Sequence, residues 1–400
     1  MKVSAIICEY NPMHNGHVHH IRKTRENGAT HIIGLLSGNF VQRGDVALLD
    51  KFDRAKLAIH HGVDLVIELP VAFSNASAEL YATGAVSILN NLGIVDELSF
   101  GSSCSDLECL ELLTEASLST TQQYLDRIRD RMRQGDSYPA ALWEIVRQRY
   151  GNKVAGMMHD PNNMLAIEYM KAMHKVNAGF KPFTIERQCV IHDSMEPSDM
   201  YASASFVRKS VAEGDMAYLD YVPEDTAKLI AQRTSEGKIA DVRRLERLIL
   251  HRIRTMQPEE LLELPDVNES LQNRIYAARH ANSWDELLAG VKARCFTMSR
   301  IRRIMMAAVI GIRREDLRYY PPYARVIAFN ERGRELMGYA KKKSRIPIGT
   351  SLAKLSEEGR LANKFVRLEE RATDVYGLSV EKMFSAEQEF RMKIVPEVTK

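Results

Sequence analysis

The chain has 400 residues, of which 45% are hydrophobic and 27% are charged. This length predicts two or three domains, and the apolar content is ample for full-sized hydrophobic cores. The five cysteines are scattered without the paired spacing of a metal site, which favours a reduced environment and no structural metal. No apolar stretch is long enough to cross a bilayer, and the N-terminal residues lack the pattern of a signal peptide. We therefore expect a cytoplasmic protein with no membrane partner.

The net charge of +3 hides an asymmetry between the two halves of the chain. Residues 1–200 contain 19 Lys and Arg and 24 Asp and Glu, whereas residues 201–400 contain 36 and 28. Most of the basic excess lies between Arg300 and Arg345. A basic half predicts a polyanionic partner, although a solvated basic helix face would give the same count.

The first hundred residues alternate between apolar strands and helices. Such alternation predicts a parallel sheet with right-handed crossovers, in which ligands bind at the carboxyl ends of the strands. The fold class that we expect is therefore α/β, with a Rossmann-like parallel-sheet domain. The predicted strands are 3–8, 30–36, 63–69 and 97–100, and the predicted helices are 16–27, 50–61 and 78–92.

The turn after the first predicted strand contains His14 and His17, and a helix is predicted from Gly16. A helix N-terminus offers unpaired N–H groups and a partial positive charge, which suit phosphate. Two imidazoles beside it can donate hydrogen bonds to phosphate oxygens and to the charge that develops as pyrophosphate leaves. A pair of surface histidines is the alternative, because His-x-Gly-His often occurs by chance. The preceding strand and the following helix favour a phosphate site.

Two later features complete this outline. Asn162 lies at a predicted helix start, where it would either cap the helix or hydrogen-bond an adenine or ribose. A strand is predicted at 183–187. The second half is predicted to be mainly helical, with helices at 240–254, 259–264, 269–279, 283–292, 298–310 and 361–376 and a small strand-helix-strand unit near 325–350.

The His14-x-Gly16-His17 pattern, in this setting, resembles the nucleotidyltransferase superfamily. Residues 9–17, 37–45 and 62–70 narrow the resemblance to the bacterial tRNA(Met) cytidine acetate ligase family, because simple adenylyltransferases normally carry only the first of these. The basic run at 300–303 also resembles a helix in the C-terminal half of that family. The resemblance covers most of the chain and is most specific in the first hundred residues.

The segment from Tyr201 to Lys209 resembles the I-S-S-T-x-x-R element of the superfamily, in which hydroxyls, N–H groups and an arginine hold the terminal phosphates. Ala204 stands where the element has its second serine, so one hydroxyl is missing. An ordinary Ser-capped helix is the alternative. The residues at issue are Ser205 and Arg208.

The resemblance implies a ligase that forms acetyl-adenylate from acetate and ATP. The acetyl group is then transferred to N4 of the wobble cytidine, C34, of elongator tRNA(Met), giving N4-acetylcytidine. Mg²⁺ would be carried mainly by the phosphates of ATP, since no carboxylate cluster suggests a protein site for it. The catalytic residues implied are His14 and His17. The implied ATP-binding residues are Ile7, Cys8, Glu9, Tyr10, Asn11, Pro12, His14, Gly16, His17, His20, Gly101, Asn162, Arg187, Gln188, Ser205 and Arg208.

The expected substrate and tRNA contacts follow from the same resemblance. Asn39, Gln42 and Arg43 would orient acetate or the cytidine, or would only hold their loop against its own helix. We expect a catalytic domain at 1–220 and a helical, basic tRNA-binding region at 221–400. No oligomeric state is predicted. The candidate phosphate contacts to tRNA are Arg300, Arg302, Arg303, Arg313, Arg314, Lys341, Lys342 and Lys343.

Two other functions remain open at the level of sequence. A small-molecule adenylyltransferase would explain the histidine motif but would leave the basic half without a role. A non-catalytic RNA-binding protein would explain the charge but would make the intact histidine turn a coincidence.

Overall fold

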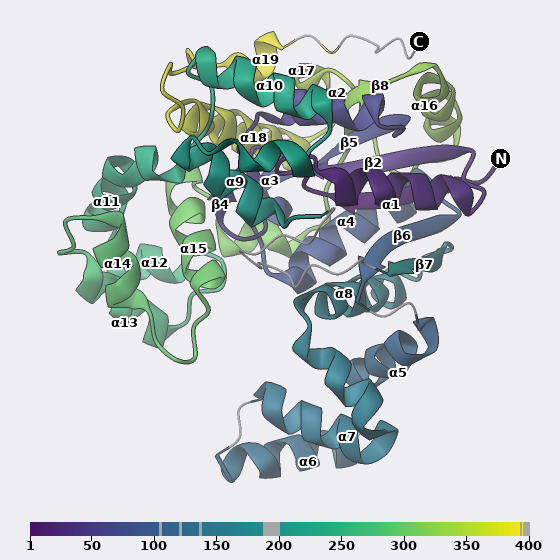
Figure 1. Ribbon diagram of the computed structural model, residues 1–400. Helices are drawn as coiled ribbons and strands as arrows, with labels where there is room; N and C mark the ends of the chain where they lie inside the picture. Colours follow the sequence, from purple (N-terminus) through teal and green to yellow (C-terminus); the bar gives the residue numbers. More distant parts are fainter. Residues whose placement is uncertain (104–105, 120–121, 136–137, 187–200, 393, 395–400) are drawn as a thin grey trace.

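The computed structural model describes residues 1–103, 106–119, 122–135, 138–186, 201–392 and 394. A seven-stranded sheet lies at its centre in the order β7-β6-β1-β2-β5-β8-β9, with helices on both faces (Figure 1). β1 (Val3–Cys8) is parallel to its neighbours β2 (His31–Ser37) and β6 (Glu97–Ser102). β5 (Leu65–Leu69) and β7 (Lys181–Glu186) extend this parallel part. The predicted Rossmann-like α/β fold is confirmed.

The helices of the first hundred residues lie close to their predicted positions. They are α1 (Asn15–Glu26), α2 (Lys51–His60) and α4 (Ala78–Leu92). The carboxylate of Asp50 caps α2 by accepting hydrogen bonds from two N–H groups of its first turn. Gly93 ends α4 with a φ of 66°, a left-handed conformation that glycine adopts without steric cost. Local sequence therefore determines these boundaries.

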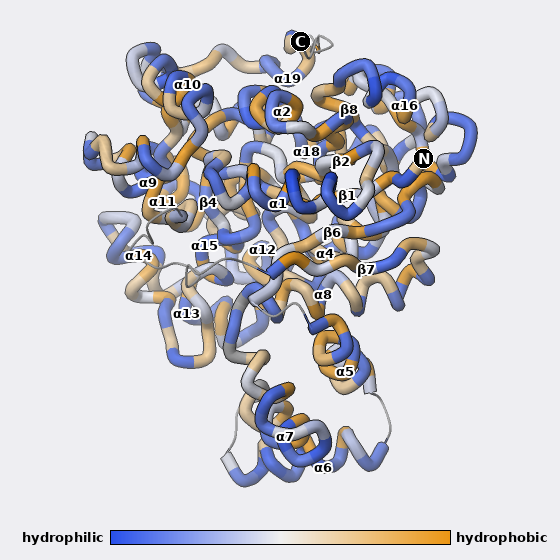
Figure 2. The backbone as a smooth tube through the Cα atoms, turned by 45° about the vertical axis from the view of Figure 1, so that its right-hand side comes forward, coloured by the Kyte–Doolittle hydropathy of each residue, from blue (hydrophilic) through white to orange (hydrophobic). Residues whose placement is uncertain are grey.

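Both faces of the sheet are buried. On β2, Ile32 and Leu36 belong to one apolar cluster together with residues of α1 and α2, whereas Ile33 and Leu35 belong to a second cluster together with α4. Strands covered on both sides read as continuous apolar runs, as these do. Figure 2 shows α1 as a largely hydrophilic helix on the outside of this layer.

Two strands from the second half of the chain complete the sheet. β8 (Ala324–Phe329) is antiparallel to β5, and β9 (Ile348–Gly349) is parallel to β8. With α16 (Glu331–Lys343) between them, they form the strand-helix-strand unit that the sequence predicts, but the unit is part of the central sheet. The domain boundary at residue 220 stays a prediction, and this strand pairing crosses it.

The remaining described elements surround the sheet. A helical lobe between β6 and β7 is visible at the bottom of Figure 1, and the second half is mainly helical, as predicted.

No helix within the described ranges is both long and apolar enough to cross a membrane. A small separate hairpin consists of β3 (Phe40–Val41) and β4 (Asp45–Val46). The lobe contains α5 (Leu107–Leu118), α6 (Gln122–Arg133) and α7 (Tyr138–Gly156), and the other helices are α3 (Val71–Ser74), α8 (Pro161–Lys175), α9 (Ala204–Glu213), α10 (Glu224–Ser235), α11 (Glu246–Thr255), α12 (Pro258–Leu262), α13 (Glu269–Ala278), α14 (Trp284–Val291), α15 (Met298–Ile310), α17 (Leu352–Ser356), α18 (Arg360–Gly377) and α19 (Gln388–Arg391), with short 3-10 turns at Met157–His159, Met216–Tyr221, Val242–Leu245 and Arg314–Arg318.

A buried cluster of two cations and two carboxylates joins distant parts of the chain. Lys51 donates from Nζ to Glu68 Oε1 at 2.5 Å and to Glu389 Oε1 at 2.7 Å. Arg325 donates to Glu68 Oε2 at 2.9 Å and also to Glu389. Each of the four side chains is at most 2% exposed. The cluster therefore fastens the start of α2, the paired strands β5 and β8, and α19 to one another.

The charge balance of this cluster makes stability depend on pH. Burial alone would raise the pKa of Glu389, but the positive charges of Arg325 and Lys51 lower this pKa to about 2. A carboxylate with a lowered folded-state pKa stabilises the folded protein above its unfolded-state pKa. The stabilisation is lost as pH falls toward the folded-state value.

Replacing this carboxylate tests the account. We expect Glu389→Gln to lower the free energy of unfolding at pH 7 by about 3 to 5 kcal/mol, because two buried cations lose part of their compensation. Between about pH 5 and pH 2 the unaltered protein loses on the order of 3 kcal/mol through this group, and the variant lacks that loss. Urea unfolding at a series of pH values measures both effects. Glu387→Gln, at an exposed position on the same segment, is the control, and equal pH profiles for all three proteins would contradict the prediction.

Candidate functional site

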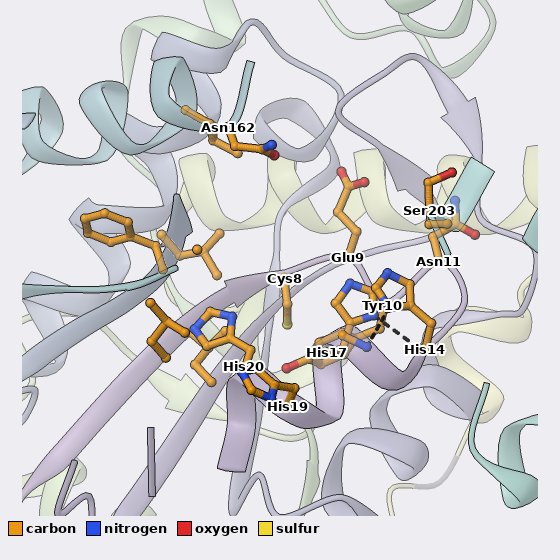
Figure 3. A pocket seen from close by; sticks show the side chains of 18 of the residues that line it. Cys8, Glu9, Tyr10, Asn11, His14, His17, His19, His20, Asn162 and Ser203 are labelled. Carbon is orange, nitrogen blue, oxygen red and sulfur yellow. Dashed lines mark hydrogen bonds between the residues drawn. The ribbon is translucent and has the colours of Figure 1, made fainter. Parts of the chain in front are cut away.

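A pocket of about 270 Å³ lies where the carboxyl ends of β1, β6 and β7 meet, at the edge of the sheet that the sequence predicts (Figure 3). Most of the predicted ATP-binding residues line it. Pro12 and Ser205 are not among the lining residues, and Arg187 and Gln188 lie outside the residues that the structure describes. The predicted residues that do line the pocket are Ile7, Cys8, Glu9, Tyr10, Asn11, His14, Gly16, His17, His20, Gly101, Asn162 and Arg208, together with Gln42 and Arg43 of the predicted substrate loop.

Arg54, a fully buried residue of α2, holds the edge of the pocket in place. Its guanidinium donates to the carbonyl oxygens of Glu9 at 2.6 Å, Ser37 at 3.0 Å and Gly38 at 2.5 Å, and to that of Leu49 at 3.0 Å. Carbonyl groups that leave the ladder of the sheet need other donors when they are buried. One side chain thus fixes the turns that follow β1 and β2.

His14 and His17 form a stacked pair at the N-terminus of α1. His14 Nδ1 accepts a hydrogen bond from the N–H of Gly16 at 3.1 Å, and His17 Nδ1 accepts one from the N–H of His14 at 3.2 Å. The ring centroids are 3.6 Å apart, and Tyr10 packs edge-on against His17 at 5.0 Å. Because both Nδ1 atoms accept, the neutral form of each ring carries its proton on Nε2. The pair therefore provides two Nε2–H donors in the pocket.

Gly16 allows the ring of His14 to lie against the backbone. A Cβ atom at position 16 would be 3.0 Å from His14 Cε1 and 3.1 Å from His14 Nδ1. His14 thus caps the first turn of α1, and the two imidazoles lie together at the positive end of the helix. Such an arrangement suits a polyphosphate.

Asn162 lines the pocket from a different element than the histidine turn (Figure 3). Phe100, Gly101 and Leu165 also line the pocket. Asn162 does not cap its helix, because the carboxylate of Asp160 accepts the hydrogen bond from the N–H of Asn162 at 2.7 Å. The capping alternative for Asn162 is therefore wrong, and its buried side chain lines the pocket.

His20 belongs to the wall of the same pocket. Its Nε2 lies 2.9 Å from Ser99 Oγ, which is also hydrogen-bonded to Thr24 Oγ1 at 2.8 Å. These hydroxyls fix the ring of His20 against β6, so that the imidazole lines the pocket in one orientation.

The start of α9 lies beside the histidine turn. Ser203 caps this helix, with its Oγ accepting from the N–H of Phe206 at 3.1 Å. Arg208 donates to the carbonyl of Asn11 at 2.8 Å and to Ser205 Oγ at 3.3 Å. The serine that lines the pocket is therefore Ser203, whereas Ser205 contacts the arginine. Ser205 was predicted to bind ATP, but it does not line the pocket and instead contacts Arg208. The serine at the N-cap position of α9 is the one that lines the pocket.

Several lining residues were not predicted. Residues 201–204 belong to the segment that resembles the I-S-S-T-x-x-R element, of which only Ser205 and Arg208 were predicted as site residues. The others are apolar, or are polar residues outside any motif, and a single sequence does not distinguish a side chain that faces a ligand from one that faces the core. The lining residues that were not predicted are Ile6, His19, Tyr81, Phe100, Leu165, Tyr169, Ile185, Glu186, Tyr201, Ala202, Ser203 and Ala204.

The loop that carries Gln42 and Arg43 closes one side of the pocket. The N–H of Gln42 donates to Glu9 Oε1 at 2.8 Å. Burial raises the pKa of Glu9, and this hydrogen bond opposes the rise. Asn39 lies away from the pocket: its Oδ1 accepts from the N–H of Lys51 at 3.0 Å, and its Nδ2 donates to Thr373 at 3.3 Å. Asn39 thus has the alternative role of holding the loop against its own helix.

The arginines at the start of α15 contact other parts of the protein. Arg300 donates to the carbonyl of Asp266 at 2.6 and 3.0 Å. Arg303, whose side chain is 11% exposed, donates to the carbonyl of Gln42 at 3.3 Å and lies 3.5 Å from the carboxylate of Asp266. Arg302 is half-buried. Arg300 and Arg303 therefore bind acceptors within the protein, and a contact of this run with tRNA stays a prediction.

The other predicted basic contacts lie apart from one another. Arg313 pairs with Glu263 on the surface, and Arg314 donates to a backbone carbonyl. Residues Lys341–Lys343 are exposed at the end of α16. There the carbonyl of Lys343 is 3.0 Å from the Cβ position of Gly93, which ends the helix before β6. The three lysines therefore lie near the amino ends of the parallel strands, at the edge opposite the pocket.

The described residues contain no group of three or more His, Cys, Asp or Glu side chains placed to hold a metal ion. The donors near the histidine turn are imidazoles and backbone N–H groups, which bind anions.

Comparison with known proteins agrees with this geometry. Residues 1–391 match the family described as HIGH Nucleotidyl Transferase, a class consistent with the histidine turn at the carboxyl edge of a parallel sheet. The chain is 37% identical over 389 residues to a tRNA(Met) cytidine acetate ligase of Thermoanaerobacter sp. (strain X514), covering 95% of this chain and 96% of the relative. It is 33% identical over 413 residues to the ligase of Acetivibrio thermocellus, covering 99% and 100%.

Solved structures give the same result. Thermotoga maritima TmcAL is 28% identical over the whole of both chains and superposes with a TM-score of 0.94 for its apo form and 0.92 for the form bound with alpha-thio ATP. The chain belongs to the tRNA(Met) cytidine acetate ligase family. The predicted family is confirmed.

Gly16→Ala tests the placement of the His14 ring. The added methyl group must push the imidazole away, so we expect ATP-dependent release of pyrophosphate to slow about 100-fold. The free energy of unfolding should change little, because alanine is a good helix former. Gly338→Ala in α16 is the control, since a Cβ atom there meets no atom within 4 Å. Equal rates for the two variants would contradict the role given to Gly16.

Proposed function

We propose that this protein uses ATP to activate acetate and then acetylates N4 of the wobble cytidine, C34, of elongator tRNA(Met), in the cytoplasm. The observation that carries the proposal is the pair of Nε2–H groups of His14 and His17 at the N-terminus of α1, in a pocket that Phe100 and Leu165 also line. The nucleotide bound by the Thermotoga relative, alpha-thio ATP, supports ATP as the substrate.

The first half-reaction needs alignment rather than a base, because acetate is ionised at neutral pH. One carboxylate oxygen attacks the α-phosphorus of ATP. A new P–O bond forms while the bond to the oxygen of pyrophosphate breaks, and the electron pair leaves with pyrophosphate. The protein must stabilise the charge that builds on the β-phosphate, which is the role that we propose for the imidazoles of His14 and His17 at the positive end of α1.

Acetate itself is proposed to bind beside Arg43. Arg43 and Arg208 are the guanidinium groups that line the described part of the pocket. Arg208 donates to Asn11 and Ser205 beside the histidine turn, near the proposed phosphate position. Arg43 lies on the loop that Glu9 fastens through Gln42, so we assign the acetate carboxylate to Arg43.

In the second half-reaction, N4 of the cytidine attacks the carbonyl carbon of acetyl-adenylate. A C–N bond forms, the C–O bond to AMP breaks, and N4 releases one proton. The wobble base must first leave its stack, as single-stranded loop bases do more readily than paired ones. Mg²⁺ is proposed to enter on the phosphates of ATP, since the donor set of the pocket suits anions.

Nucleoside mass spectrometry tests the whole reaction. Purified protein is incubated with ATP, Mg²⁺, labelled acetate and elongator tRNA(Met), and label is expected in N4-acetylcytidine. Initiator tRNA is the control substrate and should stay unlabelled. Pyrophosphate release that does not depend on acetate, with no label in tRNA, would instead favour a small-molecule adenylyltransferase.

His17→Asn separates the chemistry of the motif from its structure. The Oδ1 atom of asparagine can still accept the hydrogen bond from the N–H of His14, but no donor replaces Nε2. We expect kcat for acetate-dependent pyrophosphate release to fall about 100- to 1,000-fold, with the melting temperature preserved. His60→Asn, at a half-exposed position on α2, is the control. A variant that retains full kcat would refute the role of His17.

The three lysines of α16 test the predicted contact with tRNA. If Lys341, Lys342 and Lys343 each bind a phosphate, changing all three to Ala should reduce the slope of log affinity against log salt by about 2 to 3. Acetate-dependent exchange of pyrophosphate into ATP should stay unchanged, because the lysines lie far from the pocket. Filter binding at several salt concentrations measures the slope. Equal slopes for variant and unaltered protein would show that another surface binds tRNA.

A further inference from the structure

The loop that carries Gln42 and Arg43 is held from two sides. On the inner side, Glu9 Oε1 accepts a hydrogen bond from the N–H of Gln42 at 2.8 Å. On the outer side, Arg303 of α15 donates from Nη1 to the carbonyl of Gln42 at 3.3 Å. This carbonyl belongs to the peptide group that joins Gln42 to Arg43. Its orientation therefore sets the direction in which the backbone enters Arg43.

The loop and α15 also touch directly. Gly44 has a φ of +72°, and a Cβ atom there would lie 2.3 Å from the N atom of Arg303 and 2.6 Å from the carbonyl carbon of Arg302. The side chain of Asn75 donates to the carbonyl of Arg303 at 3.0 Å, which anchors α15 in turn. Glycine permits this approach, and the loop rests on the backbone of the helix.

Arg303 is well placed to act through the loop. Its side chain is 11% exposed, and its second partner is the carboxylate of Asp266 at 3.5 Å. Arg300, one turn earlier, donates to the backbone carbonyl of the same Asp266 but is not bonded to the loop. The two arginines thus share one anchor, and within the part of the chain that the structure describes, Arg303 is the one of the two that donates to the loop.

We infer that Arg303 is a positioning residue for acetate, acting through the peptide between Gln42 and Arg43. This inference rests on the proposed function and extends it to the helical half of the chain, which has no residue of its own in the pocket lining as described. The helical half thereby shapes the acetate end of the active site.

The test compares Arg303→Met with Arg300→Met, which removes the same charge from the same helix and from the same anchor. Acetate-dependent exchange of pyrophosphate into ATP is measured over a range of acetate and ATP concentrations. For Arg303→Met we expect the KM for acetate to rise about tenfold, with the KM for ATP and the affinity for tRNA within about twofold of the unaltered protein. For Arg300→Met all three values should stay within about twofold.

Two further variants protect the test against a simple loss of structure. Arg303→Lys keeps one donor and should recover part of the acetate KM. Gly44→Ala changes the loop instead of α15. The added methyl group pushes the loop away from the helix and should raise the acetate KM as Arg303→Met does. Melting temperatures establish that each variant is folded.

Other outcomes would overturn the inference in distinguishable ways. An equal rise in acetate KM for Arg300→Met and Arg303→Met would mean that both arginines only stabilise α15. An unchanged acetate KM with weaker tRNA binding in Arg303→Met would mean that Arg303 contacts RNA. Absence of acetate-dependent exchange in the unaltered protein would overturn the proposed function itself, and this inference with it.

Discussion

The structure depends on one buried arrangement of charge, in which Lys51 and Arg325 share the carboxylates of Glu68 and Glu389. Burying a cation away from water is costly unless carboxylates and hydrogen bonds compensate it, so each partner must be in place for the others to be tolerated. Arg325 lies on the antiparallel strand from the second half of the chain, and Glu68 lies on the parallel strand beside it. The cluster therefore makes the nucleotide-binding sheet and the C-terminal half one folded unit.

The pocket depends on the same edge of the sheet as the charged cluster. Arg54, three residues after Lys51 of the cluster, binds the carbonyl groups that leave β1 and β2. The turn after β1 places His14 and His17 at the start of α1. Asn39 contacts both the start of α2 and Thr373 of α18. The nucleotide end and the loop of Arg43 are consequently built on a common support, and neither is an independent surface loop.

The features that could be predicted from the sequence are those that depend on neighbouring residues. Apolar runs, a helix cap and the His-x-Gly-His spacing located the strands, the first helices and the histidine turn that lines the pocket. Contacts between distant parts of the chain could not be predicted. No local pattern indicates that β8 pairs with β5, or that Asn39 contacts Thr373, 334 positions later. The charge count predicted an RNA surface on α15, but it did not show that Arg300 and Arg303 donate to the carbonyls of Asp266 and Gln42. The sequence likewise did not show that Ser203 lines the pocket while Ser205 accepts a hydrogen bond from Arg208.

The burial of Glu389 has a consequence for the synthesis of the protein. Lys51 leaves the ribosome 338 residues before the carboxylate that helps to neutralise it, although the strands around Lys51 are themselves complete much earlier. During elongation the carboxyl edge of the sheet must stay hydrated, or rely on Glu68, while the rest of the chain is made. The nucleotide-binding half thus reaches its final form only when nearly the whole polypeptide exists, so a prematurely terminated chain carries the histidine motif without the core that makes it an enzyme.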